Sequence, residues 1–258
     1  MSRLYLLVLT GCGRLGFETV GTETSDASVD AVPFDVCAAT PVADTVALYT
    51  FEGSTVTDAT GAHSGTKVGD VDQAAGRCGT DAIGFPAGTH VRVPDSPAFD
   101  LAAGSIELFV QTATPAVGDI QGILSRDAVG TDFDGHLSMA LGPTGQLWVR
   151  MQRTANVTVF RCTAGSIPAN QWVHVGVSFG SAGFRLWLDH TQATGTTTEF
   201  DGGQVDCTTP HPFGIDGNDN TLVLGALDFT DANADPEPGT VRPFTGGQID
   251  QVHLHSTA

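Results

Sequence analysis

Apolar and polar residues alternate with a period of two along most of the chain after Val42. In residues 105–110, for example, Ile106, Leu108 and Val110 occupy every second position. Successive side chains of a β-strand point to opposite faces, so such a run predicts a strand with one row facing a core. The same alternation occurs in residues 146–151, 172–179 and 184–189.

Shorter apolar runs predict further strands at Thr45–Phe51, Thr66–Val71, Ala82–Phe85, His90–Val93, Gly122–Arg126, His136–Leu141, Val157–Cys162, Thr221–Ala226 and Gln248–His255. Turns rich in glycine separate several of these runs, at residues 142–145, 181–183 and 202–203. We find no convincing amphipathic helix in the sequence. Many strands joined by short turns predict an all-β fold, a two-sheet antiparallel sandwich.

Composition agrees with a strand-rich domain and narrows the class of ligand. Of the 258 residues, 32 are glycine and 16% are charged, which disfavours a coiled coil or a helical bundle. The length allows one large β domain with tails or two small domains; we expect one, at residues 37–258. The formal net charge of −18 repels phosphate backbones, so we expect no nucleic-acid partner. The same charge suits a cation or an uncharged ligand.

The first residues resemble an export signal with a lipid-attachment site. Arg3 precedes the short apolar run Leu4–Leu9, and residues 9–12 (Leu-Thr-Gly-Cys) resemble a bacterial lipobox, whose cysteine is diacylated and becomes the new N-terminus. The run is too short to span a bilayer, which needs about 20 apolar residues. We predict a signal peptide at residues 1–11, lipidation of Cys12, and membrane attachment through the lipid alone. The alternative is an ordinary buried first strand.

The residues after Cys12 indicate where an exported protein would be held. By resemblance to lipoprotein sorting, Gly13 at the next position favours the outer membrane of a bacterial cell envelope, on either its periplasmic or its outer surface. Residues 12–36 contain many small, hydroxyl and acidic residues and no run long enough for a core, which predicts a flexible, disordered acidic linker. The apolar run is short even for an export signal, which leaves open a start further upstream.

Cysteine spacing predicts disulfides. With Cys12 lipidated, four cysteines remain, and an even number in an exported chain favours two bridges. Of three possible pairings we favour Cys37–Cys78 with Cys162–Cys207, because each closes a local loop within one half of the domain. The alternative is four free buried thiols. No Cys-x-x-Cys motif occurs, which disfavours a zinc ribbon or a thioredoxin-like redox site.

An ordered set of short motifs resembles a known family. The segments are, in chain order, Ala47–Glu52 (ALYTFE), Gly84–Pro86 (GFP), Val91–Pro97 (VRVPDSP), Ser105–Val110 (SIELFV), Gln171–Val175 (QWVHV), Phe184–Asp189 (FRLWLD) and Gly247–Val252 (GQIDQV). Together they resemble the laminin-G-like jelly-roll domains of the concanavalin-A-like lectin and glucanase superfamily, over about Val42 to His255. The resemblance implies two curved antiparallel sheets in a jelly roll and, usually, a binding or adhesion role. One departure is His190, at a turn position where glycine is usual.

The sequence lacks the catalytic strand of the glucanases in that superfamily. Those enzymes carry two or three acids at alternate strand positions, which places carboxylates on one face for glycoside hydrolysis. Here Glu107 has no acid two residues away, and Asp250 is a single carboxylate flanked by amides. No His-Glu-x-x-His, Gly-x-Ser-x-Gly or Walker motif occurs. We expect no enzymatic activity and no organic cofactor; a catalytic triad assembled in space is the alternative.

A structural calcium ion is implied by the resemblance. Related jelly rolls hold calcium between the N-terminal and C-terminal strands, and the matching donors here are Asp58 and Asp250, with Glu52 as a further candidate. Calcium prefers hard oxygen ligands such as carboxylates and backbone carbonyls. The alternative is that Asp58 caps a turn and Asp250 is simply hydrogen-bonded.

Two tryptophans predict a ligand platform. We expect Leu147, Val149 and Met151 to face the core, and likewise Phe184, Leu186 and Leu188. The side chains between them then lie on outer faces. These are Trp148, Arg150, Arg185, Trp187 and Asp189. Aromatic rings can stack on the C–H faces of a sugar while polar groups hold its hydroxyls. The alternative is that the tryptophans are covered and the arginines shield apolar surface.

These features together predict a non-catalytic lipoprotein of the cell envelope whose sandwich binds a carbohydrate or an extracellular protein. The second interpretation is a structural spacer without a ligand, and the third is a hydrolase.

Overall fold

The computed structural model describes residues 37, 40–113, 119–127, 135–153, 158–193, 196–198, 204–206, 214–228 and 241–257, with the backbone alone for 152–153, 158–164, 196–198 and 204–206. All of them belong to one compact unit, residues 33–258. The predicted signal peptide, the Cys12 lipid and most of the linker lie outside the described residues. Within the described ranges no helix is long and apolar enough to cross a membrane.

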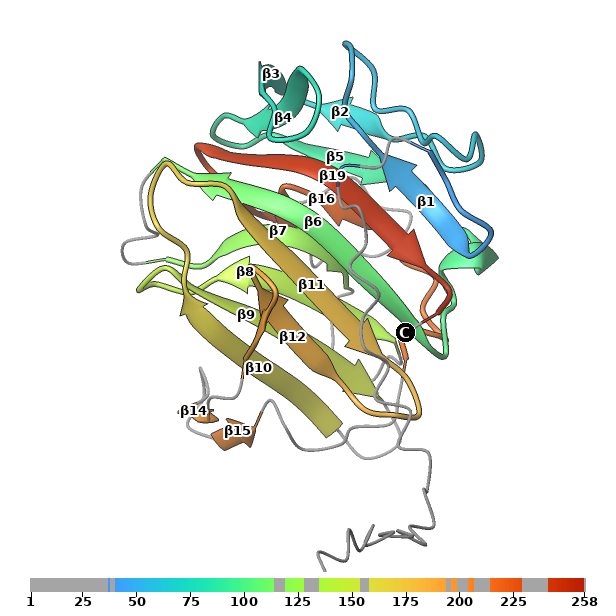
Figure 1. The fold of residues 1–258 in the computed structure, drawn as a ribbon, viewed down its shortest axis with the longest axis vertical. Helices are drawn as coiled ribbons and strands as arrows, with labels where there is room; N and C mark the ends of the chain where they lie inside the picture. The colour runs from blue at the N-terminus through green and yellow to red at the C-terminus, as the bar shows by residue number, and fades with distance from the viewer. Residues whose placement is uncertain are drawn as a thin grey trace, which may run out of the picture. The chain divides into compact units, whose positions relative to one another are not determined.

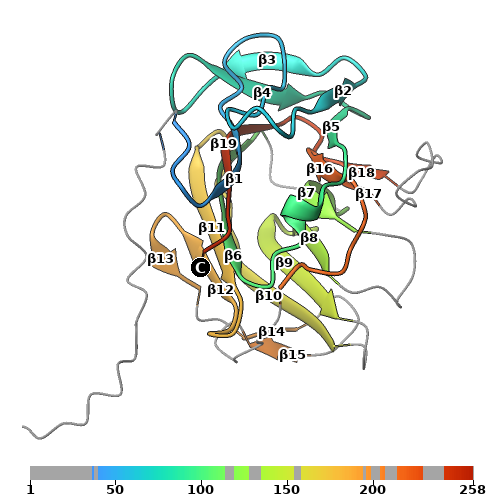
Figure 2. The ribbon, with the colours of Figure 1, turned by 90° about the vertical axis from the view of Figure 1, so that its right-hand side faces the viewer.

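Two large antiparallel sheets make up the unit (Figure 1). The eight-stranded sheet contains, in spatial order, β13 (Thr191–Gln192), β12 (Arg185–Leu188), β11 (Val173–Phe179), β6 (Gly104–Thr112), β19 (Gly247–His255), β4 (Asp81–Phe85) and β3 (Asp72–Ala75), with β1 (Thr45–Tyr49) also paired to β19. The seven-stranded sheet contains β10 (Thr158–Ser166), β9 (Gln146–Arg153), β8 (His136–Leu141), β7 (Gln121–Arg126), β16 (Leu222–Leu224), β5 (His90–Val93) and β2 (Thr66–Val68). Figure 2 shows the sheets as two facing layers. The all-β sandwich expected from the alternation is confirmed.

Strand β19 is the centre of the eight-stranded sheet. One of its edges pairs with β6. The other edge is shared: Gly247–Ile249 pair with β4, and Val252–His255 pair with β1. A bulge at Gln251, whose φ is 51°, separates the two halves. Strand β19 therefore pairs with three strands from the first half of the chain.

The core lies between the sheets and consists of the rows that the alternation predicts. Its members include alternate residues of β6, β9 and β11, among them Ile106, Leu108, Val110, Leu147, Val149, Met151, Val173, Val175 and Val177. Leu186 of β12 belongs to the same cluster, and its neighbours Arg185 and Trp187 do not. Side chains at the intervening positions of each strand therefore point away from the core, on the two outer faces.

One predicted strand is divided in the structure. The run Thr221–Ala226 breaks at Gly225 into β16 and β17 (Ala226–Asp228). Gly225 has φ of 80°, and a Cβ there would lie 2.2 Å from the Phe85 ring, so only glycine fits the break. The break lets β17 leave the sheet and pair with β18 (Val241–Pro243). Apolar content alone could not show this, because both halves are hydrophobic.

The β17–β18 hairpin lies against β7 on the outer side of the seven-stranded sheet (Figure 2). Its backbone approaches so closely that a Cβ on Gly122 would lie 1.8 Å from the Leu227 nitrogen. The remaining short elements are a single 3₁₀ turn, η1 (Pro97–Phe99), and the pair β14 (Thr196–Thr198) and β15 (Gln204–Asp206).

A disulfide joins Cys37 to Cys78, with 5.2 Å between their Cα atoms. This pairing confirms one of the two predicted bridges. The other prediction, Cys162–Cys207, lies outside the described residues, since neither the Cys162 side chain nor Cys207 is described.

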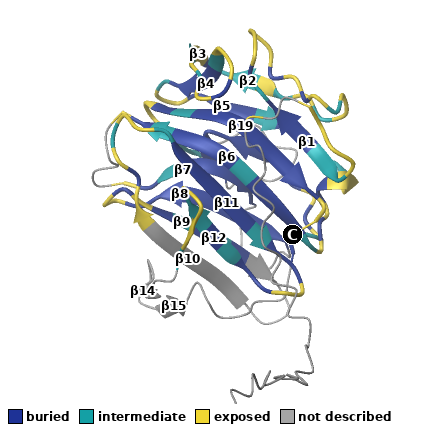
Figure 3. Cartoon of the chain, viewed as in Figure 1, coloured by how far each residue is buried: buried dark blue, intermediate teal, exposed yellow. Residues whose placement is uncertain are grey.

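Polar side chains on the outer face of the eight-stranded sheet are buried; Figure 3 shows β19, β6 and β11 buried along most of their length. His174 Nε2 lies 3.2 Å from Glu107 Oε2, and His253 Nε2 lies 3.1 Å from Gln251 Oε1. Burial and the nearby His255 lower the pKa of His253 from its ordinary 6.5 to about 4. Its imidazole is therefore uncharged at neutral pH.

Removing the Cys37–Cys78 bridge should destabilise the domain. The bridge closes a loop with a sequence separation of 41, and the loss of unfolded-chain entropy for such a loop is worth about 4 kcal/mol. We expect the Cys37→Ser/Cys78→Ser variant to lose about this much unfolding free energy in urea titrations. The Cys162→Ser/Cys207→Ser variant serves as the comparison. Equal unfolding free energies for wild type and the Cys37→Ser/Cys78→Ser variant would contradict the Cys37–Cys78 bridge.

Stability should fall in mild acid because of His253. As the pH drops below 6.5 the unfolded chain takes up a proton that the folded domain accepts only near pH 4, so stability present above this window is lost across it, by about 3 kcal/mol. We expect the slope of unfolding free energy against pH in this window to flatten in His253→Gln. The exposed His190, changed to Gln, is the control. An unchanged slope in His253→Gln would show that its imidazole is not held neutral.

Candidate functional site

The predicted tryptophan platform is divided between opposite faces. Trp148 and Arg150 lie on β9 of the seven-stranded sheet, whereas Arg185 and Trp187 lie on β12 of the eight-stranded sheet. Because both strands turn their other row into the shared core, the two tryptophans point away from each other. The structure therefore does not assemble the five predicted residues into one site.

Trp148 packs on the outer face of the seven-stranded sheet. Its ring contacts a small apolar cluster separate from the core, formed by Ile120, Ala140 and Leu227. Leu227 comes from the β17–β18 hairpin, so the hairpin supports one side of the indole. Trp148 is partly buried, so a part of its side chain remains accessible to solvent. This is a fixed aromatic surface, which a stacking ligand requires.

Arg150, two residues further along β9, is held by a buried carboxylate. Its Nη1 lies 3.2 Å from Asp127 Oδ2, with 15% of the arginine side chain and none of the aspartate side chain exposed. Asp127 also accepts a hydrogen bond from the Ser138 hydroxyl and contacts His136 Nδ1. A buried charge with several partners is costly to move, so Asp127 fixes the guanidinium beside Trp148.

Local sequence explains how these groups converge. In β8, Leu137 and Met139 belong to the core, so His136, Ser138 and Ala140 lie on the outer face. Asp127 follows the last residue of β7, and β7 pairs directly with β8. Register then places Ala140 opposite Trp148 and Ser138 opposite Arg150.

Arg126 fixes the end of β7 and hence the position of Asp127. Its guanidinium is buried and bonds the carboxylates of Asp95 and Asp100, at 2.8 and 3.0 Å. It also donates to the carbonyls of Phe99 and Ile215, at 3.0 and 2.8 Å. Sequence reasoning missed Asp127, His136 and Ser138. The available signal was the alternation in His136–Leu141, which carries polar residues on the face opposite its apolar row.

The geometry of Asp127, His136 and Ser138 does not match that of a nucleophilic triad. In a Ser-His-Asp triad the imidazole lies between the hydroxyl and the carboxylate and takes the hydroxyl proton. Here the carboxylate contacts both other groups. The arrangement therefore holds the arginine.

The opposite face has a different character. The Trp187 ring lies over Gly176, 3.7 Å from where a Cβ would stand. Asp189 and His190 form the two-residue turn between β12 and β13, with φ of 44° and 64°. Such turns favour residues that tolerate positive φ, so His190 is a strained choice where glycine is usual. Asp189 accepts the His174 N–H at 2.9 Å, which gives it a structural role in the turn.

Asp58 does not fit the predicted calcium site. Its carboxylate accepts backbone N–H groups from Leu48, Thr60 and His63, at 2.9, 3.0 and 2.9 Å. Burial alone raises the pKa of Asp58, but these hydrogen bonds hold it below its ordinary value. Both oxygens accept hydrogen bonds from β1 or the loop that follows it. This arrangement agrees with the alternative prediction that Asp58 caps a turn.

Asp250 and Glu52 fit a cation better, because both flank the same loop. Asp250 Oδ2 accepts the N–H groups of Arg77 and Cys78, at 2.7 and 2.8 Å, while Oδ1 is buried without a hydrogen-bond partner. Glu52 accepts the Thr80 N–H at 3.0 Å. Burial, with a smaller contribution from Glu52, raises the pKa of Asp250. In the described part of the chain no three His, Cys, Asp or Glu side chains converge as a metal site, so carbonyls or water would supply the other ligands.

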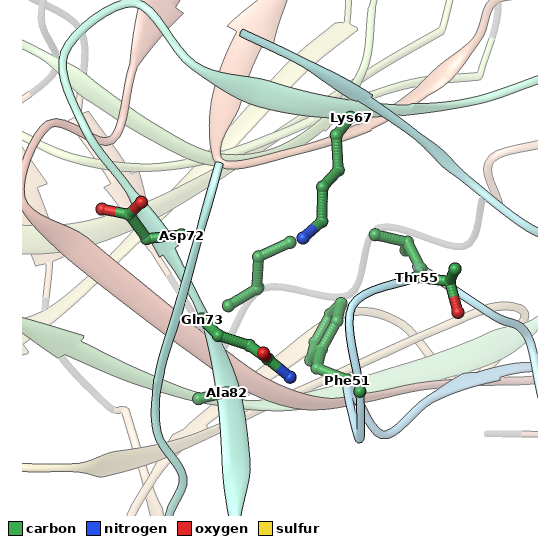
Figure 4. Close-up of a pocket in the computed structure, with 9 residues that line it drawn as sticks. Phe51, Thr55, Lys67, Asp72, Gln73 and Ala82 are labelled. Atoms are coloured by element: carbon green, nitrogen blue, oxygen red, sulfur yellow. The ribbon is translucent and has the colours of Figure 1, made fainter. Parts of the chain in front are cut away.

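A separate recess lies between β2, β3 and the segment after β1 (Figure 4). The Lys67 side chain points into it, towards Phe51 and Gln73. The recess is open to solvent, and its roughly 170 Å³ of empty space includes that open solvent, so it encloses far less than the range of about 300–1,000 Å³ typical of small-molecule sites. We therefore place the candidate site on the outer face of the seven-stranded sheet, at Trp148, Arg150 and Asp127.

Solved structures with the same fold cover most of the chain. Domain 4 of AbnA, an extracellular GH43 arabinanase from Geobacillus stearothermophilus in complex with arabinotriose, is 19% identical, with a TM-score of 0.53, over 82% of this chain and 92% of that one. The binding domain of botulinum neurotoxin DC in complex with SialylT is 10% identical, with a TM-score of 0.57, over 83% of this chain and 48% of that one.

The sialidase of Trypanosoma rangeli, in complex with 2,3-difluorosialic acid, is 12% identical, with a TM-score of 0.54, over 85% of this chain. The match spans 32% of the sialidase. At these identities the likeness concerns the fold alone. None of the curated protein sequences matches the chain.

The sequence profile of the "Concanavalin A-like lectin/glucanases superfamily" (Laminin_G_3) matches residues 85–258. That segment contains β5 to β19, and so both predicted tryptophans and the Asp127 cluster. Since the match covers more than half of its residues, the chain belongs to the concanavalin A-like lectin/glucanases superfamily.

Proposed function

We propose that the outer face of the seven-stranded sheet binds a glycan. The observation that carries the proposal is a partly exposed tryptophan on a rigid sheet, next to an arginine held by a buried carboxylate. Trp148 offers a ring for the C–H face of a sugar, and the Arg150 guanidinium offers N–H donors for hydroxyl groups. Both sit on strands, so neither loses much freedom when a ligand binds.

The similar structures support a carbohydrate as the class of ligand. An arabinanase domain, a neurotoxin binding domain and a sialidase are all in complex with sugars or sugar derivatives, according to their descriptions. They share this fold and do not by themselves identify which face is used here. An extracellular protein as the partner stays a prediction that nothing in the fold favours over a sugar.

Binding without catalysis is the second part of the proposal. The strand that carries acids in the glucanases has one counterpart here, Asp250, whose Oδ2 is engaged by two backbone N–H groups. The carboxylate that holds Arg150 is Asp127, which is wholly buried and engaged by three side chains. A general acid or base must reach the proton it transfers, and neither carboxylate reaches an open surface.

The third part of the proposal concerns location. A lipid on Cys12 followed by the acidic linker would hold the sandwich at a bacterial envelope and leave its faces accessible. A mature protein in which Cys12 is unmodified and still joined to Gly11, seen by intact mass, would remove this part. The spacer interpretation differs from the binding one only in the absence of a ligand at Trp148.

Substituting Trp148 should weaken glycan binding strongly. Loss of one stacked ring costs about 0.5–1.5 kcal/mol in addition to the lost contact area, so we expect Trp148→Ala to reduce affinity about tenfold or more. The measurement is a glycan array on the domain, followed by calorimetry with the best-bound glycan. Arg150→Gln should also weaken binding, since it removes charged donors.

Trp187→Ala is the matched control, because that tryptophan lies on the opposite outer face. It should leave affinity unchanged. Loss of binding in Trp187→Ala with normal binding in Trp148→Ala would move the site to the eight-stranded sheet. A folded domain that binds no glycan on the array would favour the spacer.

Calcium at Asp250 is a separate structural prediction. A divalent cation would satisfy the buried Oδ1 and lie near Glu52, whereas Asp58 is fully engaged. After chelation, we expect added calcium to release heat in calorimetry and to raise the melting temperature. Asp250→Asn should abolish both effects, and Asp58→Asn should destabilise the domain without abolishing them. Absence of heat and of a melting shift in wild type would eliminate the ion.

A further inference from the structure

We propose that His174 and His190 form a binding site for a divalent transition-metal ion such as Zn²⁺. The site lies on the outer face of the eight-stranded sheet, whereas Trp148 lies on the outer face of the other sheet. The metal site therefore does not depend on the proposed glycan site. It is also separate from the calcium predicted at Asp250, which lies two strands away on β19.

His174 lies on β11, with its ring between two other rings. Its neighbours Val173 and Val175 belong to the core, so the His174 side chain points to the outer face. Its ring centre lies 5.2 Å from that of Phe109 on β6 and 5.2 Å from that of His190, in the turn after β12. Strands β6, β11 and β12 are adjacent (Figure 1). The sheet therefore holds this imidazole between an apolar ring on one side and a second imidazole on the other.

The two ring nitrogens of His174 have different surroundings. Nε2 lies 3.2 Å from Glu107 Oε2, and a carboxylate only accepts, so Nε2 carries the proton. Nδ1 is buried and has no hydrogen-bond partner among the described residues, and 9% of the side chain is exposed. In the neutral ring Nδ1 carries the lone pair that can bind a metal. Histidines that bind metals commonly donate their other N–H to a carboxylate in this way.

His190 occupies a position where the backbone favours a different residue. Asp189 and His190 form the two-residue turn between β12 and β13, with φ of 44° and 64°, and glycine is preferred at the second position of such a turn. A side chain held against this preference indicates a role for the side chain itself. His190 is exposed, so its ring can turn towards an ion beside His174.

The separation of the two imidazoles matches a shared ion. Zinc binds imidazole nitrogens at about 2.0–2.1 Å in tetrahedral geometry, which places two bound rings with their centres about 5 Å apart. The centres of His174 and His190 are 5.2 Å apart. In the described part of the chain no three His, Cys, Asp or Glu side chains converge as a metal site. Water would therefore fill the other positions, and the two imidazoles determine the choice of ion.

Nitrogen ligands select a class of ion that differs from calcium. Imidazole suits zinc, copper and nickel, whereas calcium and magnesium prefer oxygen ligands. An ion bound by both rings would also link β11 to the turn between β12 and β13, because His174 and His190 come from these two elements. Binding should therefore stabilise this part of the sheet.

Carboxylates lie beside both histidines. Glu107 contacts Nε2 of His174, and the exposed Asp189, which precedes His190, accepts the His174 N–H at 2.9 Å. His253 lies opposite Glu107 on β19, and burial lowers its pKa to about 4, so it is uncharged at neutral pH. These neighbours favour a cation.

Two arginines on the same face contact other groups. Arg77 lies over the Phe109 ring, with 5.6 Å between its Cζ and the ring centre. Arg185 lies opposite Ser178, which is four residues along β11 from His174, or about 13 Å. With a formal net charge of −18 for the whole chain, the overall field also favours a cation.

Zinc binding can be measured on the full chain after dialysis against a chelator, by calorimetry with zinc chloride and by thermal unfolding. We expect wild type to bind zinc and its melting temperature to rise. In His190→Gly the metal-free protein should keep its melting temperature, because glycine suits the turn. Its zinc affinity should fall about tenfold or more, with the zinc-induced rise lost. Glu107→Gln should weaken zinc about tenfold, since a neutral amide makes Nδ1 of His174 less basic.

Two variants serve as matched controls. His63→Gln removes a partly buried imidazole elsewhere, whose ring centre lies 4.7 Å from that of Phe99. Trp187→Ala removes a large ring from β12, close to the turn that carries His190. Both should bind zinc as wild type does. Copper gives a second measurement, because the electron paramagnetic resonance spectrum of bound Cu²⁺ should show two nitrogen ligands in wild type and fewer in His190→Gly.

Three results would overturn the inference. The first is a wild-type chain that binds no zinc, and the second is equal zinc affinity in wild type and His190→Gly. The third is zinc binding that Asp250→Asn removes and His190→Gly retains, which would place the ion on β19. Glycan binding at Trp148 is measured separately, so the proposed function stands or fails independently of these results.

Discussion

The two sheets bury one row of side chains from each strand between them, and this burial determines where every other side chain lies. Leu147, Val149 and Met151 of β9 and Leu186 of β12 belong to the same cluster. Apolar burial is the main favourable term in folding, and a one-residue slip would expose the whole row. The buried row therefore also determines which side chains of each strand point outward, although those outward side chains do not contact the core.

That constraint makes the candidate site rigid. Trp148 and Arg150 are outward because their neighbours are inward, and Asp127, at the end of β7, meets them because β7, β8 and β9 pair in sequence order. Buried polar groups need partners, and here the partners of Asp127 are the side chains that define the site. The β17–β18 hairpin contributes Leu227, which packs against the indole. The hairpin backbone can approach β7 this closely only because residue 122 is glycine.

The two outer faces differ in what covers their strands. On the eight-stranded sheet, histidines and carboxylates are buried, and the His253 imidazole is held neutral by burial. On the seven-stranded sheet, the buried polar cluster lies beside a partly exposed tryptophan. Polar groups of the first face are engaged in holding loops and turns, as Asp189 and Asp250 show. Those of the second hold Arg150, whose side chain is 15% exposed.

The sequence by itself determined the fold class and the inward rows, because alternation is a local property of the chain. It favoured the Cys37–Cys78 bridge among three possible pairings, and the structure contains that bridge. It also located Trp148 and Arg150 on an outer face. Only the tertiary structure decided that Trp187 lies on the other face, that Asp58 caps a turn while Asp250 keeps a buried oxygen without a partner, and that Asp127 joins His136, Ser138 and Arg150. These relations depend on which strands pair and on which sheet each strand enters. Strand alternation is identical in both sheets, so no periodic pattern along the chain distinguishes them.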